Sequence, residues 1–313
     1  MPGSREDACR GAASDDEPSI ARSFGVRAGE PGWFSTLRVS ERHVGVIVGA
    51  IFFPLNWPLF WLFLASYCVR MWGTEGVYHR YFSHRAFKAN RFVQLVLALI
   101  GLQTGQRGPL WWAVKHREHH KFAETAKDPH SPVAHSFGRA YLTWFGRPEH
   151  AACDLDAIPD FARFAELRWL DRYYLVPFYG SAGLLFLVGH FGLLGGAITG
   201  LSALVWGFYA PCLLVVHATS LVNTLGHLPA IPGGYRRYAT RDHSSNRPLI
   251  AVLTLGAGWH NNHHRYAAPA RAGFAWYEYD PTYYVLRLLQ ALRVIHDVKS
   301  SLPPDVRREG GLR

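Results

Sequence analysis

The sequence predicts an all-α integral membrane protein with about four transmembrane helices in two hairpins and a histidine-rich helical cap on the cytoplasmic side. Three observations lead to this prediction. Two long segments contain no charged side chain, every Lys and Arg falls into the three segments around them, and a histidine triplet with the spacing HxxHH occurs twice.

The two uncharged segments are residues 43–69 and 173–235. A bilayer core about 30 Å thick requires roughly 20 apolar residues per helical span. The second segment therefore predicts two spans joined near residues 189–196. The first is either one long kinked helix or a hairpin that turns at residues 54–58, where two prolines break helices. The hairpin is favoured because the apolar character continues beyond Arg70, and a large soluble core explains neither segment well.

Lys and Arg occur in residues 1–42, 70–172 and 236–313. If the spans come in pairs, these segments share one side, and the positive-inside rule makes that side, with both termini, cytoplasmic. The net charge of +10 then faces anionic headgroups, an anionic substrate or a redox partner. We expect no nucleic-acid partner, because no basic helix or aromatic platform of such a module is present.

The remaining organisation is simple. Residues 1–30 predict a disordered N-terminal tail, residues 31–303 a single membrane domain, and residues 304–313 a C-terminal tail. The apolar stretch 92–105 is too short to cross a bilayer, so it predicts a helix beneath the membrane surface or one wall of a cavity.

Many of the histidines occur at spacings that could bring their side chains together as metal ligands. Residues i, i+3 and i+4 lie on one face of a helix, so each HxxHH triplet can aim three imidazoles into one volume. His79 and His84 are five apart and cannot share a face of a regular helix, but they could flank one metal where a membrane helix ends and unwinds. Asn223 and His227, four apart, follow the last span, where a structural role is the alternative. The candidate ligands are His79, His84, His116, His119, His120, Asn223, His227, His260, His263 and His264.

Nine imidazoles exceed one metal site, since zinc takes about four ligands. They suit two adjacent metal ions with four or five ligands each, and the ligand type fits Zn, Cu, Fe or Ni. The alternative interpretation of each triplet is a solvated basic helix face.

These motifs resemble the membrane-bound acyl desaturases, in the branch of the stearoyl-CoA (delta-9) type enzymes. The boxes HRYFSH (79–84), HREHH (116–120) and HNNHH (260–264) stand in the family's order between the expected spans. The flanks QRGPLWWAVKHREHHKF, KDPHSP, RRYATRD and GWHNNHHRY look like bacterial members. The resemblance covers roughly residues 43–300.

The resemblance implies an enzyme that inserts a cis double bond into a saturated acyl chain with O2 and two Fe ions. It implies that the nine histidines bind iron, that Asn223 reaches one iron through water, and that no catalytic residue exists beyond the metal site. It further implies an acyl-CoA, another acyl carrier or a lipid as substrate, a separate electron donor (ferredoxin or cytochrome b5-like), membrane lipid around the spans, and a place in the bacterial inner membrane.

Three positions depart from the family's pattern. Ala257 stands where a glutamate is usual, Tyr141 stands where a histidine is common, and residues 228–235 lengthen a loop. Glu75, four residues before His79, shares its face on a continuing helix. It therefore either accepts a hydrogen bond from a ligand histidine, partly replacing the missing carboxylate, or pairs with an Arg or with headgroups at the membrane edge.

Two other functions remain open from the sequence. A hydroxylase on the same scaffold shares the first hydrogen abstraction and differs only in the second step. A membrane metal-binding or transport protein would use the histidines for storage, but transport predicts ionisable residues inside the spans, and both uncharged segments lack them.

Overall fold

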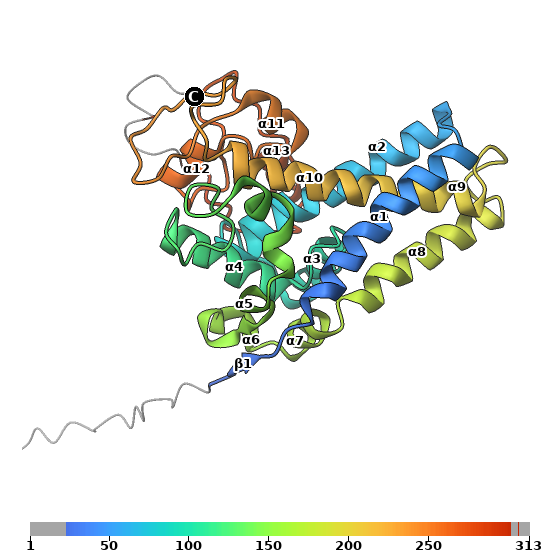
Figure 1. The fold of residues 1–313 in the computed structure, drawn as a ribbon, viewed down its shortest axis with the longest axis horizontal. Coiled ribbons are helices and arrows are strands. Elements are labelled where there is room, and N and C mark those ends of the chain that lie inside the picture. The colour runs from blue at the N-terminus through green and yellow to red at the C-terminus, as the bar shows by residue number, and fades with distance from the viewer. Residues whose placement is uncertain (1–22, 302–305, 307–313) are drawn as a thin grey trace, which may run out of the picture.

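The computed structural model describes residues 23–301 and 306 and is mostly helical (Figure 1). The α-helices are α1 (Gly32–Phe52), α2 (Trp57–Trp72), α3 (Arg91–Leu102), α4 (Pro109–Phe122), α5 (Pro148–Ala151), α6 (Pro159–Ala162), α7 (Ala165–Arg172), α8 (Leu175–His190), α9 (Gly200–Leu204), α10 (Ala210–Leu225), α11 (Pro248–Leu253), α12 (His260–Arg265) and α13 (Pro281–Ala291). The π-helices are η1 (Gly73–Ser83), η2 (Arg139–Thr143) and η5 (Val205–Tyr209), and the 3₁₀ turns are η3 (Trp144–Gly146) and η4 (Leu155–Ala157). The strands β1 (Val26–Arg27) and β2 (Cys153–Asp154) form an antiparallel pair.

Long helices form a bundle on one side of the molecule, in two consecutive pairs. The helices α1 and α2 are separated by residues 53–56, and the Asn56 side chain caps α2 by accepting from the Leu59 amide at 3.0 Å. Residues 191–199 separate α8 from the continuous helix α9–η5–α10. Both α1 and α2 pack against α10, and α8 packs against α9 (Figure 1). Both turns lie where the sequence places them.

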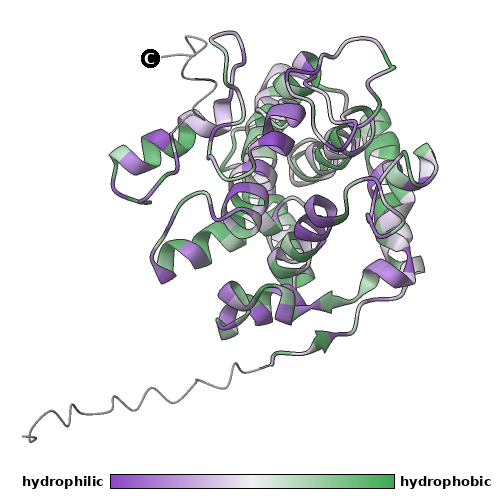
Figure 2. Ribbon diagram, turned by 90° about the vertical axis from the view of Figure 1, so that its left-hand side faces the viewer, coloured by the Kyte–Doolittle hydropathy of each residue, from purple (hydrophilic) through white to green (hydrophobic). Residues whose placement is uncertain are grey.

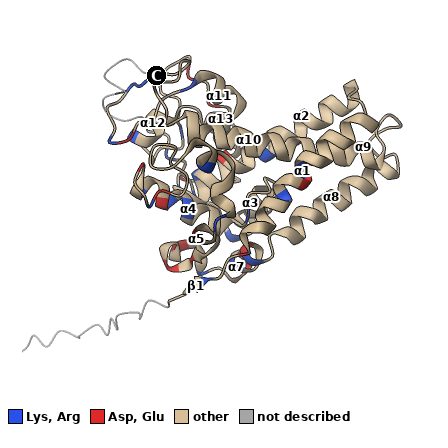
Figure 3. Ribbon diagram, viewed as in Figure 1, with Lys and Arg blue, Asp and Glu red and all other residues tan. Residues whose placement is uncertain are grey.

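Among the described residues, one helix, Gly200–Leu225, is long and apolar enough to cross a membrane by length and composition. The helix α8 has 16 residues, and α1 carries Arg38, Glu41 and Arg42 in its first half. The far end of the bundle nevertheless exposes large apolar side chains, including Ile51, Phe52, Trp57, Phe191 and Leu193. Figure 3 shows that the charged residues gather at the opposite end, around α4 and α12.

That opposite end is a helical cap in which hydrophilic and hydrophobic segments are interleaved (Figure 2). Its core includes Tyr78, Phe82, Leu110, Trp111 and Leu286, from η1, α4 and α13. The short helix predicted over 92–105 is α3, which packs against η1, so it lies against the helix that carries the first two histidines.

The predicted N-terminal tail differs in part from the structure. Residues 1–22 lie outside the described residues. Within the last part of the predicted tail, Val26 pairs with Asp154 and Arg27 with Cys153. The Asp156 carboxylate also accepts from the Phe24 amide at 2.6 Å. These contacts attach the chain to the cap before residue 30. The C-terminal tail, apart from Val306, also lies outside the described residues.

Asp171, at the end of α7, fixes the start of α4, the helix that carries HREHH. Its carboxylate is 1% exposed and accepts from the backbone amides of Leu110 and Trp111, both at 2.9 Å. It also pairs with Arg27 at 2.5 Å. Because the first amides of a helix have no intrahelical partner, this buried carboxylate satisfies groups that would otherwise be unpaired.

We therefore expect Asp171→Ala to lower the stability of the cap by about 1–3 kcal/mol, the usual cost of leaving buried donors unpaired. Thermal unfolding of the purified chain in detergent, with hydrogen exchange of the first turn of α4, measures this. Asp297→Asn, which removes the charge of an exposed partner of Lys88 and suits the left-handed backbone at that position (φ 52°), is the control and should leave unfolding unchanged. Equal unfolding of the two variants would contradict the role of Asp171.

Candidate metal centre

A π-helix brings His79 and His84 together. The amide of His84 donates to the carbonyl of His79 at 3.1 Å, a contact between residues five apart. In a π-helix the hydrogen bonds join residue i to residue i+5, so positions five apart lie nearly above one another. The two rings are 4.8 Å apart. We expected the helix to end and unwind between these two histidines. Instead it widens into the π-helix η1 and continues through Ser83.

The helix α4 presents His116, His119 and His120 as its spacing predicts. All three rings lie within 6.1 Å of one another between centroids. The helix is anchored at its first turn by Asp171, and Arg117 between the histidines donates to the backbone carbonyls of Phe82 and Ser83 at 3.0 Å. This contact attaches α4 to the end of η1, so the first two histidine boxes are fixed to each other.

The asparagines of HNNHH hold α12 in place. The Asn261 carbonyl oxygen accepts from the amides of Arg237 and Tyr238, both at 2.8 Å. The Asn262 amide group donates to Glu278 and to the Ala272 carbonyl, both at 3.0 Å. Both asparagines are fully buried. The polar residues between the histidines therefore anchor the helix, and the histidines are free to face inward.

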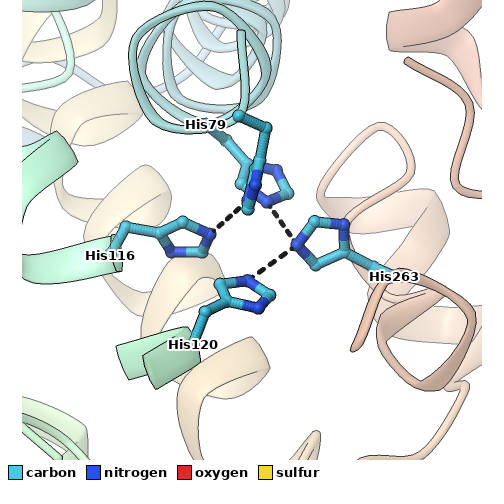
Figure 4. A group of neighbouring side chains, drawn as sticks. His79, His116, His120 and His263 are labelled. Carbon is cyan, nitrogen blue, oxygen red and sulfur yellow. Dashed lines mark hydrogen bonds between the residues drawn. The ribbon is translucent and has the colours of Figure 1, made fainter. Parts of the chain in front are cut away.

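The nine imidazoles form two neighbouring clusters. The first contains His79, His84, His116, His120 and His263, and the second contains His119, His227, His260 and His264, with the nitrogens of each cluster within 4.8 Å of one another. Figure 4 shows four rings of the first cluster converging from three different segments of the chain. The α4 triplet is divided, since His119 joins the second cluster.

Four of the imidazoles also contact carboxylates through Nδ1, on the side away from the clusters. His79 contacts Glu75 at 2.8 Å, His119 contacts Asp128 at 3.0 Å, His227 contacts Glu124 at 3.0 Å, and His264 contacts Asp242 at 2.6 Å. Of the two roles that the sequence leaves open for Glu75, the structure shows the hydrogen bond to a candidate ligand histidine. The other three carboxylates were not predicted, although Asp128 and Asp242 stand in the motifs KDPHSP and RRYATRD.

The environment favours the neutral form of six of the nine rings. Burial, with neighbouring histidines, holds the pKa of His84, His116, His120, His260 and His263 well below the usual range. Burial also lowers the pKa of His264 to about 4, against the opposing effect of Asp242. Burial raises the pKa of Asp128, but His119 outweighs burial and the net shift is downward. Neutral imidazoles beside ionised carboxylates are the protonation states that metal binding requires.

The ring nitrogens fit a metal ion. When His119 and His264 donate Nδ1–H to Asp128 and Asp242, the lone pairs of their Nε2 atoms face each other, with the two atoms 3.3 Å apart. His227 and His260 face each other through Nε2 at 2.9 Å, and so do His79 and His263. Two nitrogens that bind the same ion, each at about 2.1 Å, lie about 3 Å apart. A cation between them turns a repulsive arrangement of lone pairs into a coordination sphere.

Asn223 lies beside these clusters on α10. It lines a cavity that also contacts His79, His116, His260 and Glu75. Ala257 lines the same cavity, so the absent carboxylate leaves space next to the metal centre. The structure thus brings all ten predicted residues to one place, and their role as ligands stays a prediction.

The other departures lie outside the clusters. The Tyr141 hydroxyl contacts Nδ1 of His217 at 2.9 Å, and Nε2 of His217 faces Nε2 of His43 at 3.1 Å. The lengthened loop is held by Arg247, whose guanidinium donates to the carbonyls of Leu228, Ile231 and Pro232 at 2.7–3.1 Å. Neither departure removes an imidazole from the two clusters.

Comparison with known proteins is consistent with this geometry. The profile of the family described as "Fatty acid desaturase" matches residues 55–296. An acyl-CoA 5-desaturase of Anemone leveillei is 36% identical over 267 residues, which cover 82% of this chain and 76% of the relative. The sn-2 palmitoyl-lipid 9-desaturase of Nostoc sp. (strain 36) is 32% identical over 91% of this chain and 98% of its own length. The sn-1 stearoyl-lipid 9-desaturase of Anabaena variabilis is 32% identical over 85% and 93%.

We expect His119→Ala to reduce bound metal and to lower activity by about 100-fold or more, since loss of an outer partner alone causes about 10- to 100-fold. Membrane insertion should not change, because His119 lies in the cap. The control is His190→Ala, at the exposed end of α8, which should match the unchanged protein. Elemental analysis and product yield measure both variants, and full activity of His119→Ala would exclude the metal assignment.

We expect Glu75→Gln to lower metal content or activity by about 10- to 100-fold, because the neutral amide binds and orients His79 less strongly than the carboxylate. In the double variant Glu75→Gln/Ala257→Glu, the new carboxylate enters the same cavity and should restore part of the loss. If Glu75→Gln keeps full metal and activity, the hydrogen bond to His79 has no functional role.

Proposed function

This chain belongs to the fatty acid desaturase family, and we propose that it inserts a cis double bond into a saturated acyl chain with O2 at a centre of two iron ions. The observation that carries the proposal is the pair of adjacent imidazole clusters, each contacted by at least one carboxylate, beside a cavity that histidines of both clusters line. The enzyme is an oxidoreductase that acts on fatty acyl chains.

The metal centre would supply the oxidising power to remove hydrogen from unactivated methylene groups, a reaction that no side-chain base can perform. The chain's own residues bind and orient that centre. The nine imidazoles would hold the ions, and Glu75, Glu124, Asp128 and Asp242 fix the ring orientation and tautomer of four of them. His119 and His227 are each 1% exposed, so bulk water has little access to these two rings.

The cavity wall is rigid where an acyl chain would pass. The Trp112 indole donates to the side-chain oxygen of Gln106 at 3.1 Å. The side-chain amide nitrogen of Gln106 in turn donates to the Thr219 hydroxyl at 3.1 Å. These three side chains tie α4 to α10 next to His116, since the Trp112 ring stacks on His116 at 5.1 Å. A fixed wall holds a flexible acyl chain in one position relative to the metal centre.

The same proposal includes the surroundings of the enzyme. We infer that α1, α2, α8 and α9–η5–α10 lie in the bacterial inner membrane as two hairpins within a domain of residues 31–303, and that the cap is cytoplasmic. A separate ferredoxin or cytochrome b5-like protein would deliver electrons to the basic cap. The segregation of charged residues in Figure 3 and the positive-inside rule support this orientation.

Expression in a bacterial host that lacks its own desaturase tests the function. The fatty acids of that host should gain a monounsaturated species, and its mass spectrum gives the position of the double bond. Hydroxylated acyl chains in its place would support the hydroxylase alternative. Unchanged fatty acids in a host that supplies a suitable electron donor would contradict the proposal.

We expect the active, purified chain to contain two iron ions, because five and four imidazoles can fill two coordination spheres. Elemental analysis of a preparation that retains activity measures this. Chelation of the iron should abolish activity, and Fe(II) should restore it. One metal per chain, or stoichiometric zinc in an active preparation, would overturn the two-iron assignment.

A further inference from the structure

A chain of three side chains, separate from the metal centre, joins η2, α10 and α1. The Tyr141 hydroxyl lies 2.9 Å from Nδ1 of His217, and Nε2 of His217 lies 3.1 Å from Nε2 of His43. Nδ1 of His43 lies 2.8 Å from the Val39 carbonyl oxygen. Neither histidine belongs to the two imidazole clusters, and the described residues place no third histidine, cysteine or carboxylate close enough to complete a metal site with them.

The direction of each hydrogen bond follows from the last one. A carbonyl oxygen only accepts, so Nδ1 of His43 carries its hydrogen and Nε2 of a neutral His43 has the lone pair. Nε2 of His217 then donates to His43, which leaves a lone pair on Nδ1 of His217. The Tyr141 hydroxyl therefore donates to His217. This phenol has a base already placed to take its proton.

Tyr141 itself lies near the surface of the protein. Its ring is half-buried and stacks on that of Phe137, which is 46% exposed, at 5.5 Å between centroids. Burial raises the pKa of the Tyr141 phenol, so the hydroxyl keeps its proton at neutral pH. When the ring of a protonated phenol loses an electron, the proton has to leave as well. The neighbouring imidazole makes that loss easier, because it accepts the proton directly.

A series of aromatic rings leads from Tyr141 toward the metal centre. Trp144 follows Tyr141 by three residues in the continuous segment η2–η3. The Trp144 ring lies 5.0 Å from the ring of His130, and His130 lies 4.4 Å from the ring of His119, a candidate metal ligand. Indole and phenol are the side chains that most readily give up one electron. The series therefore connects an oxidised centre to a half-buried tyrosine.

We propose that Tyr141 is a redox-active tyrosine that discharges the metal centre when O2 has oxidised it without an acyl chain in place. The inference goes beyond the proposed function and rests on its iron centre. The O–H bond of Tyr141 breaks, and its proton forms an N–H bond at Nδ1 of His217. One electron passes by way of Trp144 and His130 to the oxidised centre, which is thereby reduced by one electron. The products are a neutral tyrosyl radical and an imidazolium.

The rest of the chain of hydrogen bonds explains how this state is held and reversed. The imidazolium of His217 can pass its Nε2 proton to His43, which moves the positive charge away from the radical. One electron from a thiol or from the electron-donor protein, with return of the proton, restores Tyr141. Tyr141 is accessible to such a reductant, whereas His119 is 1% exposed. The oxidising equivalent is thus moved from the buried ligands to a place where it can be removed.

Freeze-quench electron paramagnetic resonance tests the proposal. The iron-loaded full chain is reduced with dithionite, mixed with O2 without acyl substrate, and frozen. We expect a tyrosyl radical signal that narrows when the chain contains ring-deuterated tyrosine. Tyr141→Phe should lack the signal, and it should lose desaturase activity faster than the unchanged chain during repeated substrate-free cycles. His217→Gln, whose amide can accept a hydrogen bond but is not a base, should lower the radical yield about tenfold or more.

Tyr284→Phe, which removes a hydroxyl from a 46% exposed tyrosine of α13, is the matched control and should keep the signal. A signal that persists in Tyr141→Phe, or that His217→Gln leaves unchanged, overturns the inference. Desaturation by the same preparation, with substrate present, is measured in parallel. A preparation that desaturates and gives no tyrosyl signal overturns this inference alone, and one that does neither overturns the proposed function as well.

Discussion

The structure depends on the confinement of nine buried or partly buried imidazole rings in one small volume, with their Nε2 atoms turned toward one another. Burial makes protonation of six of these rings unfavourable, and the lone pairs of neutral rings that face each other repel unless a cation lies between them. Clusters of this kind place a strict demand on every element that carries a histidine, because each ring must reach the common volume with its Nε2 atom foremost. Hydrogen bonds hold these elements in position. They are made by the side chains of Asp171, Arg117, Asn261 and Asn262.

The same demand explains why the outer nitrogens contact carboxylates. A ring that donates Nδ1–H to Asp128 or Asp242 has its tautomer and its orientation fixed together. These acids are buried or nearly so, and an ionised carboxylate in such a place needs a hydrogen-bond donor. Histidine and acid therefore stabilise one another, and the centre is held by bonds that point away from the metal as well as toward it.

The sequence predicts the composition of the centre better than its arrangement. The spacing of His116, His119 and His120 follows from the period of an α-helix, so their common face was predictable. The wide turn that joins His79 to His84 was not, because a π-helix has no simple spacing signal. Nor could the sequence assign His119 to a different cluster from its neighbours, or bring Asp242 to His264, since both depend on how distant segments pack. Likewise, the uncharged segments locate the helices of the bundle, but one helix of the described residues has the length and composition of a span.

The helix α1 shows how the membrane and the cap constrain one another. Its second half is apolar and exposed, whereas its first half carries Arg38 and Arg42 into the cavity beside the metal centre. These charges reduce the apolar length of the helix, which weakens it as a span. They are also placed where the bundle meets the cap, in the wall of a cavity that Trp112 and Asn223 line as well. A buried, incompletely paired arginine is costly for folding alone. Arg42 offsets part of this cost by donating to the Gly105 carbonyl at 3.0 Å and by lying over the Phe178 ring, so its charge is held at the boundary by neighbouring helices and loops.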